Sequence, residues 1–464
     1  MTRTERDLIG TKEIPDDALY GIHTLRAFNN FTVSGRTLNC DFIKALATVK
    51  IASAKTNMEI ETDRDNIEKW QAIVDALEQI EAGHHDGEFI IDALSGGAGT
   101  SANMNINEVA ANLALVKLGR KKGDYNVISP LNFLNLHQST NDVFPTALKL
   151  AAIFKLKILE QNVVSLQEAF QRKEKEFAHV VKVARTELQD AVLTTVGRQM
   201  SAYSDVLSRD RWRIYKCEER LRVINLGGTA IGSGIGAPRE YIFKVSDMLR
   251  NLTGIGFARS ENMIDNTQNA DVFVEVSGIL KALAVTIAKI SGDLRILSSG
   301  PDAGIGEIIL EPRQAGSSLM PGKINPVIPE AAAQGAMEVM GNDAVIAMAA
   351  ASGNLELNQF MPLIGDKLLS SLDILINIVK ILDTNCIQSL GVDIDVCKKH
   401  VDSKTAIATA LVSRLGYDTV SELIRQSEVT GERLKDLAVK NTFITYKEIE
   451  ALITPEAVCR LGSR

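Results

Sequence analysis

The segment of this 464-residue chain that is richest in chemistry is 316–326, GSSLMPGKINP. It places two adjacent hydroxyls, Ser317 and Ser318, close to Lys323 and Asn325. A carboxylate is bound by hydrogen-bond donors and positive charge held in place, and these side chains supply both together with the N–H groups of the loop. A Gly/Pro surface turn with a solvated lysine is the alternative. We favour an anion-binding loop because similar donor-rich segments occur elsewhere in the chain.

The second donor-rich segment is 95–105, SGGAGTSANMN. Its glycines leave backbone N–H groups free, and Thr100 and Ser101 precede an apolar run at 109–118 that is typical of a helix. A helix N-terminus with free N–H groups binds anions without a formal charge. An ordinary N-cap with a Gly-rich lead-in explains the pattern equally well.

Two further segments mix hydroxyl, amide and charged groups. The run 137–142, HQSTND, has Ser139, Thr140 and Asn141 directly before the longest predicted helix. Helix capping needs one such residue, so the excess favours a binding site. The run 185–190, RTELQD, contains Thr186 and Glu187 and lies between two predicted helical runs. A solvated turn between helices explains this last run nearly as well.

Long helices must position these segments. From about 144 to 183 apolar residues recur at helical spacing, which predicts one very long helix with Asp142 as its N-cap. Similar runs occur at about 194–224, 239–252, 267–298, 326–351 and 355–388. Helices of this length are stabilised by burying a stripe against one another, so we expect an elongated bundle.

The changes of pattern predict three domains, an N-terminal domain at 1–140, a central bundle at 141–392 and a small helical domain at 393–464. In the last domain we expect short helices at 403–415, 418–427, 431–439 and 446–450. The fold class is therefore expected to be mainly α.

Composition limits the function classes. Hydrophobic residues make up 45% of the chain and aromatic residues 5%, as in packed helices, and the net charge of −7 opposes binding to nucleic acid. We find no signal segment and no stretch of membrane-spanning apolarity, and expect a cytoplasmic protein that does not bind membranes.

Cysteines and histidines give no sign of a metal site. The five cysteines are far apart without a CxxC pair, which indicates reduced thiols rather than disulfides or zinc. The adjacent His84 and His85 do not converge on one ion as i, i+4 ligands do. The run 232–237, GSGIGA, matches a dinucleotide fingerprint, but we expect a helix before it and no β-α-β unit around it, so we set nucleotide binding aside.

The four donor-rich segments, in this order and spacing, resemble the signature regions of the aspartase/fumarase superfamily, with 316–326 close to its signature sequence. The likeness extends from 7–10, DLIG, to the C-terminal domain. His23, the run 139–142 and the run 327–330 are closer to the aspartase branch than to class II fumarases.

The resemblance implies a mainly α, three-domain subunit whose central helices form the core of a homotetramer, with each active site built from three subunits. It also implies reversible elimination of ammonia from L-aspartate to give fumarate, without a cofactor or metal. Proton removal beside a carboxylate creates an enediolate-like dianion, so fixed donors aimed at that carboxylate are the physical requirement.

The resemblance also assigns roles to residues. Ser317 on a mobile loop would be the general base, as an alkoxide that N–H groups and positive charge stabilise on loop closure. The other residues would bind the substrate: Lys323, Asn325 and Thr186 at the α-carboxylate, Thr100, Ser139, Thr140 and Ser318 at the β-carboxylate, and Asn141 near the amino group.

Some residues depart from the pattern of the superfamily. Glu187 stands where fumarases carry histidine and aspartases histidine or glutamine, and a carboxylate there pairs with an ammonium group but repels a hydroxy-acid dianion. The run 129–133, SPLNF, lacks the histidine of fumarases, and Arg198 and Gln199 replace a Gln-Glu pair. Two alternatives stay open: another fumarate-releasing lyase, acting on malate or an N-substituted aspartate, and a catalytically silent relative.

Overall fold

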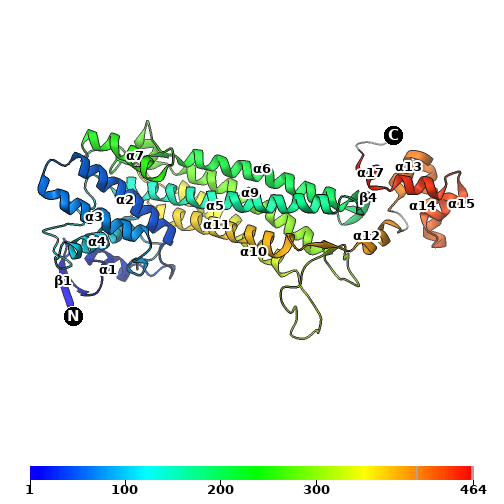
Figure 1. Ribbon diagram of the computed structural model, residues 1–464, viewed down its shortest axis with the longest axis horizontal. Helices are drawn as coiled ribbons and strands as arrows, with labels where there is room; N and C mark the ends of the chain where they lie inside the picture. The colour runs from blue at the N-terminus through cyan, green and yellow to red at the C-terminus, as the bar shows by residue number, and fades with distance from the viewer. Residues whose placement is uncertain (404–405, 461–464) are drawn as a thin grey trace. The chain divides into compact units, whose positions relative to one another are not determined.

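The computed structural model describes residues 1–403 and 406–460, so positions 404, 405 and 461–464 of the predicted C-terminal domain lie outside the described part. Seventeen α-helices and eight short strands occur within the described residues (Figure 1). Helix predominates, which confirms the mainly α fold class. None of the described helices is long and apolar enough to cross a bilayer.

The chain folds into two compact units that each use three separate stretches of sequence. Unit 1 comprises Met1–Leu159, Arg213–Ala282 and Glu338–Leu375, and unit 2 comprises Glu160–Trp212, Leu283–Met337 and Ile376–Arg464. Five long helices contribute residues to both: α5 (Thr140–Glu176), α6 (Val196–Leu221), α9 (Asp271–Leu297), α10 (Val327–Ala351) and α11 (Met361–Leu382). The three predicted domains stay a prediction.

The long helices form because each carries a continuous apolar stripe. In α9 the buried residues follow one another at alternating spacings of three and four: Phe273, Val276, Leu280, Leu283, Ile287, Ile290, Leu294 and Leu297. This spacing keeps all of them on one face of a helix. The prediction of long helices from periodicity is therefore confirmed, with α5 ending at Glu176 rather than near 183.

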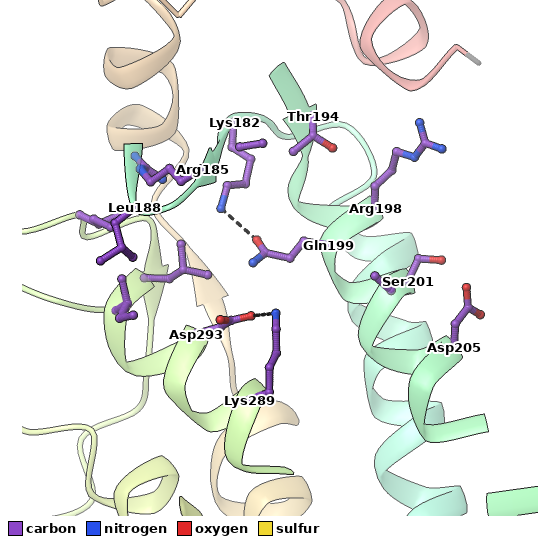
Figure 2. Close-up of a pocket in the computed structure, with 15 residues that line it drawn as sticks. Lys182, Arg185, Leu188, Thr194, Arg198, Gln199, Ser201, Asp205, Lys289 and Asp293 are labelled. Atoms are coloured by element: carbon purple, nitrogen blue, oxygen red, sulfur yellow. Dashed lines mark hydrogen bonds and ion pairs between the residues drawn. The ribbon is translucent and has the colours of Figure 1, made fainter. Parts of the chain in front are cut away.

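Polar contacts join neighbouring long helices within each unit. In unit 1, Asp343 of α10 accepts hydrogen bonds from Ser277 Oγ (2.8 Å) and Lys281 Nζ (2.5 Å) of α9. In unit 2, the Tyr203 hydroxyl of α6 donates to Asp293 of α9 (2.6 Å), and Figure 2 shows that Asp293 faces a cavity between these helices. The bundle arrangement predicted for the middle of the chain thus holds inside each unit.

Unit 2 adds a β-hairpin and a group of small helices. These elements are β3 (Val181–Thr186), β4 (Gln189–Thr195), β7 (Ile308–Ile309), β8 (Gly391–Val392), a π-helical turn at Asp383–Ile387, α12 (Ile394–Val401), α13 (Ala408–Leu415), α14 (Tyr417–Thr430), α15 (Leu434–Asn441), α16 (Tyr446–Leu452) and α17 (Pro455–Cys459). Buried Leu411, Leu423 and Leu437 of the small helices share one apolar cluster with Val183 and Leu193 of the hairpin. The predicted short C-terminal helices are confirmed, although the first begins at Ala408 rather than at 403, and they pack on the hairpin.

The remaining elements of unit 1 precede the long helices or lie between them. They are β1 (Thr2–Arg6), β2 (Thr11–Pro15), α1 (Ile22–Asn30), α2 (Cys40–Ile60), 3₁₀ turns at Arg64–Asn66 and Asp86–Glu88, α3 (Ile67–Glu81), α4 (Thr100–Lys117), β5 (Val223–Ile224), α7 (Arg239–Thr253), β6 (Ala258–Arg259) and α8 (Met263–Gln268).

The expectation that no β-α-β unit surrounds 232–237 was too strict. The stretch up to Leu221 is helical as expected, but β5 and β6 pair in parallel on either side of α7. Each strand has only two residues, so no sheet forms that could carry a dinucleotide site of the Rossmann type.

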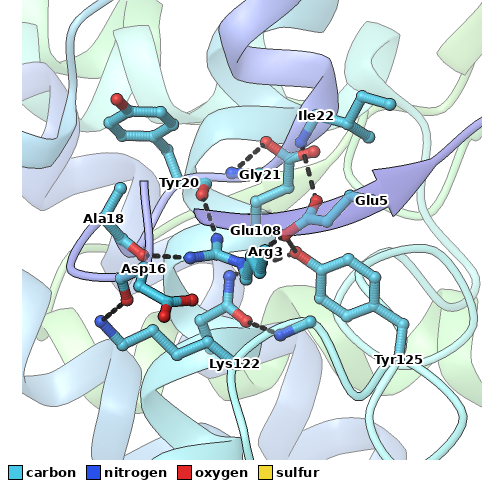
Figure 3. A network of polar contacts seen from close by, with 12 residues as sticks. Arg3, Glu5, Asp16, Ala18, Tyr20, Gly21, Ile22, Glu108, Lys122 and Tyr125 are labelled. Atoms are coloured by element: carbon cyan, nitrogen blue, oxygen red, sulfur yellow. Dashed lines mark hydrogen bonds and ion pairs between the residues drawn. The ribbon is translucent and has the colours of Figure 1, made fainter. Parts of the chain in front are cut away.

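Two carboxylates hold the start of α1 (Figure 3). Glu108 of α4 accepts the N–H groups of Gly21 and Thr24 (both 3.0 Å), and Glu5 of β1 accepts that of Ile22 (2.8 Å). The first N–H groups of a helix have no acceptor within the helix, so these side chains satisfy them. Burial raises the pKa of Glu108 to about 7 in spite of its donors. The network anchors the N-terminal segment to α4.

Candidate active site

Three of the predicted substrate-binding residues of unit 1, Thr100, Ser139 and Thr140, line one cavity of about 400 Å³. Thr100 is the first residue of α4 and follows Gly99, whose φ of 92° is left-handed. A Cβ on Gly99 would lie 2.3 Å from the ring of Phe144, so only glycine lets α4 begin this close to α5. The cavity therefore joins two hydroxyls at the start of α5 to the N-terminus of α4.

The start of α5 is held by a reciprocal cap. Ser139 Oγ accepts the backbone N–H two residues further on (3.2 Å), and the carboxylate of Asp142 accepts the N–H of Ser139 (3.0 Å). Since α5 begins at Thr140, the N-cap is Ser139 and the prediction of Asp142 was wrong. Asp142 is the third helical residue and is fully buried, where it also accepts the N–H groups of Gly227 (3.1 Å) and Thr229 (2.9 Å).

Buried amides that the sequence analysis did not identify support the hydroxyl of Thr140. Asn103 Nδ2 donates to Thr140 Oγ1 (3.1 Å) and to Asn135 Oδ1 (2.9 Å), which also lies 3.2 Å from Lys50 Nζ. Because Thr140 Oγ1 already accepts a hydrogen bond, its own O–H remains to donate to a ligand. The sequence feature that could have identified these amides is the alternation of asparagine with apolar residues at 103, 105 and 107, in a helix that is buried.

Asn141 does not share the cavity with its neighbours. Its side chain lines a separate void of about 10 Å³ near Lys149, and its Nδ2 donates to the carbonyl of Ala230 (2.7 Å). That hydrogen bond fixes the amide so that Oδ1 is the atom left to accept a hydrogen bond from a ligand.

His137 lines the cavity of about 400 Å³ together with Thr100, Ser139 and Thr140. The sequence indicated only the segment 137–142 and not this residue. Its φ is 62°, a left-handed conformation that is costly for a residue with a Cβ, and its Nδ1 lies 2.9 Å from Asn57 Oδ1. The ring centroid is 5.3 Å from that of Tyr241. Burial lowers the pKa of His137, so the neutral imidazole is favoured.

In unit 2, the loop 316–326 folds back on itself. The N–H of Gly316 donates to the carbonyl of Lys323 (2.8 Å), and Asn325 Nδ2 donates to the carbonyl of Gly316 (2.7 Å). Ser317 Oγ accepts the N–H groups of Leu319 (3.1 Å) and Met320 (2.9 Å). Two N–H groups aimed at one hydroxyl oxygen stabilise negative charge on that oxygen.

Lys323 and Asn325 line a cavity of about 670 Å³ with Arg295, Arg313 and Glu330. Lys323 is exposed, as are Ser318 and most of the loop tip. The loop therefore presents its cation to solvent while its backbone is held at both ends.

The predicted turn at 185–190 is the tip of a β-hairpin rather than a connection between helices. Thr186 is the last residue of β3 and pairs with Gln189, and Glu187 and Leu188 form a two-residue turn at φ values of 53° and 64°. Such turns require left-handed residues and usually contain glycine or asparagine. Strained non-glycine residues cluster at functional sites, and both Thr186 and Glu187 are exposed.

A cavity of about 620 Å³ lies beside the hairpin between α6 and α9 (Figure 2). Lys182 of β3 donates to Gln199 Oε1 (2.9 Å), and Gln199 Nε2 donates to the hydroxyl of Tyr203 (2.9 Å). The side chain of Arg198, the other departure from the superfamily pattern, donates to the carbonyl of Cys459 (2.9 Å). Gln199 and Arg198 therefore link α6 by hydrogen bonds to β3 and to the end of α17.

The predicted site residues fall into three groups. Unit 1 holds the cavity group, Thr100, Ser139 and Thr140, with Asn141 next to it. Unit 2 holds the loop group, Ser317, Ser318, Lys323 and Asn325, and the hairpin group, Thr186 and Glu187. Each group offers donors suited to a carboxylate or, at Glu187, an acceptor suited to a cation. Among the described residues no cluster of three or more His, Cys, Asp or Glu is placed to hold a metal ion.

Comparison with sequence families gives two matches. The family described as lyase matches residues 10–341, and the family described as fumarase C C-terminus matches residues 407–460. Together they cover all three groups of predicted site residues.

Individual relatives and solved structures are similar over nearly the whole chain. An aspartate ammonia-lyase from Bacillus sp is 41% identical, covering 99% of this chain and 98% of the relative, and one from Helicobacter pylori is 40% identical, covering 98% and 97%. A fumarate lyase:delta crystallin structure from Brucella melitensis bound to cobalt has a TM-score of 0.93 at 40% identity, covering 98% of this chain and 99% of that one. A class II fumarase from Schistosoma mansoni has a TM-score of 0.93 at 28% identity, covering 99% of each.

Proposed function

The chain belongs to the aspartase/fumarase superfamily of lyases, and on this premise we propose that it is an aspartate ammonia-lyase, which reversibly eliminates ammonia from L-aspartate to give fumarate. Relatives named aspartate ammonia-lyase at 40–41% identity over nearly the full length support this reaction rather than hydration of fumarate. The protein is thus a carbon–nitrogen lyase.

The observation that carries the mechanism is the pair of N–H groups at Ser317 Oγ. Elimination begins with removal of a proton from the methylene carbon, and Ser317 is the proposed base. A free serine hydroxyl is too weak an acid to serve as an alkoxide, so the oxyanion needs fixed donors that do not have to reorganise. The N–H groups of Leu319 and Met320 at 3.1 and 2.9 Å supply them in the loop itself. The exposed Lys323 of the same loop is the proposed source of positive charge.

The developing charge of the intermediate resides on the carboxylate next to the carbon that loses its proton. Thr100, Ser139, Thr140 and Ser318 are the proposed donors to this β-carboxylate, and Lys323, Asn325 and Thr186 hold the α-carboxylate. The hydrogen bond from Asn103 to Thr140 supports this assignment because it turns the O–H of Thr140 into a donor for the ligand. Donors that are already oriented stabilise the dianion more than the substrate, which is what lowers the barrier.

One acceptor, the carboxylate of Glu187, favours an amino group over a hydroxyl group on the substrate. Glu187 is exposed at the strained tip of the hairpin, and a carboxylate there attracts an ammonium group. Asn141 has its Nδ2 engaged by Ala230, so its Oδ1 is the atom that remains to accept a hydrogen bond, and we propose that the amino group donates to it. The hydroxyl of malate can also donate to Asn141 Oδ1, but it carries no charge for the Glu187 carboxylate to attract.

The proposed assembly is a homotetramer in which three subunits complete each active site, within a three-domain architecture. Large apolar side chains are exposed on the long helices of the single chain, among them Phe154 and Ile158 of α5, Trp212 of α6, and Met337 and Met348 of α10. Exposed apolar faces on otherwise soluble helices indicate surfaces that other copies cover. The five cysteines are all free, which suits the reducing conditions of the cytoplasm, the proposed location.

The function is tested by incubating the purified protein with L-aspartate, L-malate and argininosuccinate and following the absorbance of fumarate. We expect fumarate from L-aspartate, with kcat/KM at least about a hundredfold above that for the other two, because only L-aspartate carries a free ammonium group on the carbon whose bond is broken. Fumarate from malate or argininosuccinate but none from L-aspartate would overturn the proposal in favour of another lyase of the superfamily. If none of the three compounds gives fumarate, the protein would be a catalytically inactive member of the superfamily.

A further inference from the structure

One buried carboxylate in unit 2 gathers three nitrogen donors from two different elements. Glu307 has a fully buried side chain, and its Oε2 lies 2.9 Å from Lys182 Nζ. Its Oε1 accepts hydrogen bonds from Arg185 Nη2 and His400 Nδ1, each at 2.9 Å. Lys182 and Arg185 belong to β3, whereas His400 belongs to α12.

The charge balance of this cluster makes its geometry critical. Burial alone would raise the pKa of Glu307, but the hydrogen bond from Arg185 and the charge and contact of Lys182 outweigh it and hold the pKa below its usual range. Two cations thus share one buried carboxylate, and a buried ion pair is favourable only if its donors stay in place. The position of the end of β3 is tied to Glu307.

The end of β3 carries part of the proposed substrate site. Arg185 is followed directly by Thr186, the last residue of the strand, and by Glu187 in the strained turn. Arg185 also lies 3.5 Å from Asp190 on the opposite strand, so it links both strands of the hairpin to the cluster. A shift of Arg185 therefore shifts both proposed substrate contacts.

His400 stands at the outer side of the cluster. Its Nδ1 is 3.4 Å from Arg185 Nη2, and both groups point at the same oxygen of Glu307. His400 is 28% exposed and Arg185 15%, whereas Glu307 is fully buried, so the imidazole lies between the ion cluster and solvent. It fixes the side from which the guanidinium approaches and limits the access of water to the ion pair.

We propose that His400 is a positioning residue that fixes the Thr186–Glu187 tip of the hairpin by holding Glu307 and Arg185 in one arrangement. The proposal rests on the proposed function for its effect on turnover, but not for its effect on the hairpin. It also gives the C-terminal helices a role, since α12 packs on β3 and connects them to the site.

The test compares His400→Leu, which removes the N–H donor, with His400→Asn, whose amide N–H occupies the same δ position. His179→Asn, at an exposed histidine of the same unit, is the matched control. We expect His400→Leu to raise KM for L-aspartate about tenfold with kcat changed less than about threefold, because substrate contacts loosen while Ser317 is untouched. His400→Asn should stay within about threefold of the wild type, like the control.

Hydrogen–deuterium exchange provides a readout that does not depend on catalysis. The amides of residues 183–192 should exchange about tenfold faster in His400→Leu than in the wild type and the His400→Asn protein, with the rest of the chain unchanged. Equal exchange in all four proteins would overturn the proposal, as would equal loss of function in His400→Leu and His400→Asn.

If the His400→Leu protein does not fold, His400→Gln takes its place, since its amide nitrogen occupies the ε position of the imidazole and not the δ position that contacts Glu307. Should the wild-type protein convert no L-aspartate, the proposed function fails, and the exchange experiment still decides the role of His400.

Discussion

Replacing Gly99 with alanine tests the claim that α4 must begin against α5 to build the cavity. Gly99 has a left-handed φ of 92°, and a Cβ there would lie 2.3, 2.7 and 2.9 Å from three atoms of the Phe144 ring. That ring is 3% exposed and packs on Phe42 with centroids 4.6 Å apart, so it has little room to move. The substitution must displace the start of α4 and with it Thr100.

The expected loss of stability in Gly99→Ala has two parts. A side chain in the left-handed region costs about 1 kcal/mol, and forcing extra volume into a packed core costs about 1–3 kcal/mol, so Gly99→Ala should destabilise the protein by about 3 kcal/mol. For a chain of 464 residues the entropy of unfolding is about 1 kcal/mol/K, so this loss lowers the apparent melting temperature by about 3 °C. Because a displacement of about 1 Å at a binding group costs about a hundredfold in rate, kcat/KM for L-aspartate should fall by a similar factor.

Gly119→Ala is the matched control for this prediction. Gly119 follows the other end of α4 with a φ of 68°, but a Cβ there would meet no atom within 4 Å. It should lose about 1 °C of melting temperature from the backbone strain alone and keep kcat/KM within about threefold. Differential scanning fluorimetry and the fumarate assay measure both quantities. If the two variants behave alike, the argument from the close contact of Gly99 with Phe144 is refuted.

Four further outcomes are expected. Ser317→Ala should lower kcat by at least about a thousandfold with the oligomeric state unchanged by size-exclusion chromatography, and near-normal turnover would remove Ser317 from the role of base. Glu187→Gln should raise KM for L-aspartate about tenfold and tighten inhibition by fumarate, since a charge that attracts ammonium and repels a dianion is lost; unchanged constants would contradict this. The folded pKa of His137 lies below its unfolded value of 6.5, so its contribution to stability is present above about pH 6.5 and is lost as pH falls toward the lower folded pKa. The melting temperature of the wild type should therefore approach that of His137→Asn as pH falls, and a constant difference would argue against the shift. Finally, mixed Ser317→Ala and Thr140→Ala subunits should regain about a quarter of wild-type activity after joint refolding if the two groups come from different copies, and none if they come from the same copy.

The sequence was sufficient to predict the long helices and the segments that carry the donors. The stripe of α9 is visible as a regular spacing of apolar residues, and the excess of polar groups at 137–142 exceeds what one helix cap needs. Both features are local, so they can be recognised without knowledge of distant contacts. The family resemblance of the loop 316–326 was equally local.

Other features depend on contacts between residues far apart in sequence. The run 181–195 was assigned to helix and turn, because the apolar residues of β3 continue the pattern of α5 and the turn residues Glu187 and Leu188 give no glycine or asparagine signal. The cluster around Glu307 joins residues more than a hundred positions apart, so no local sequence pattern predicts it. The alternating asparagines at 103–107 likewise do not show that Asn103 donates to Thr140, because these two residues are 37 positions apart.

We propose that the protein reversibly adds ammonia to fumarate and that Ser317 transfers the proton. A proton NMR time course of fumarate and ammonium in D₂O tests both parts of this proposal. With the wild-type protein we expect aspartate that carries one deuterium on its methylene carbon, and with Ser317→Ala we expect no such aspartate. Formation of deuterated malate in place of aspartate, or of deuterated aspartate by the Ser317→Ala protein at the wild-type rate, would contradict it.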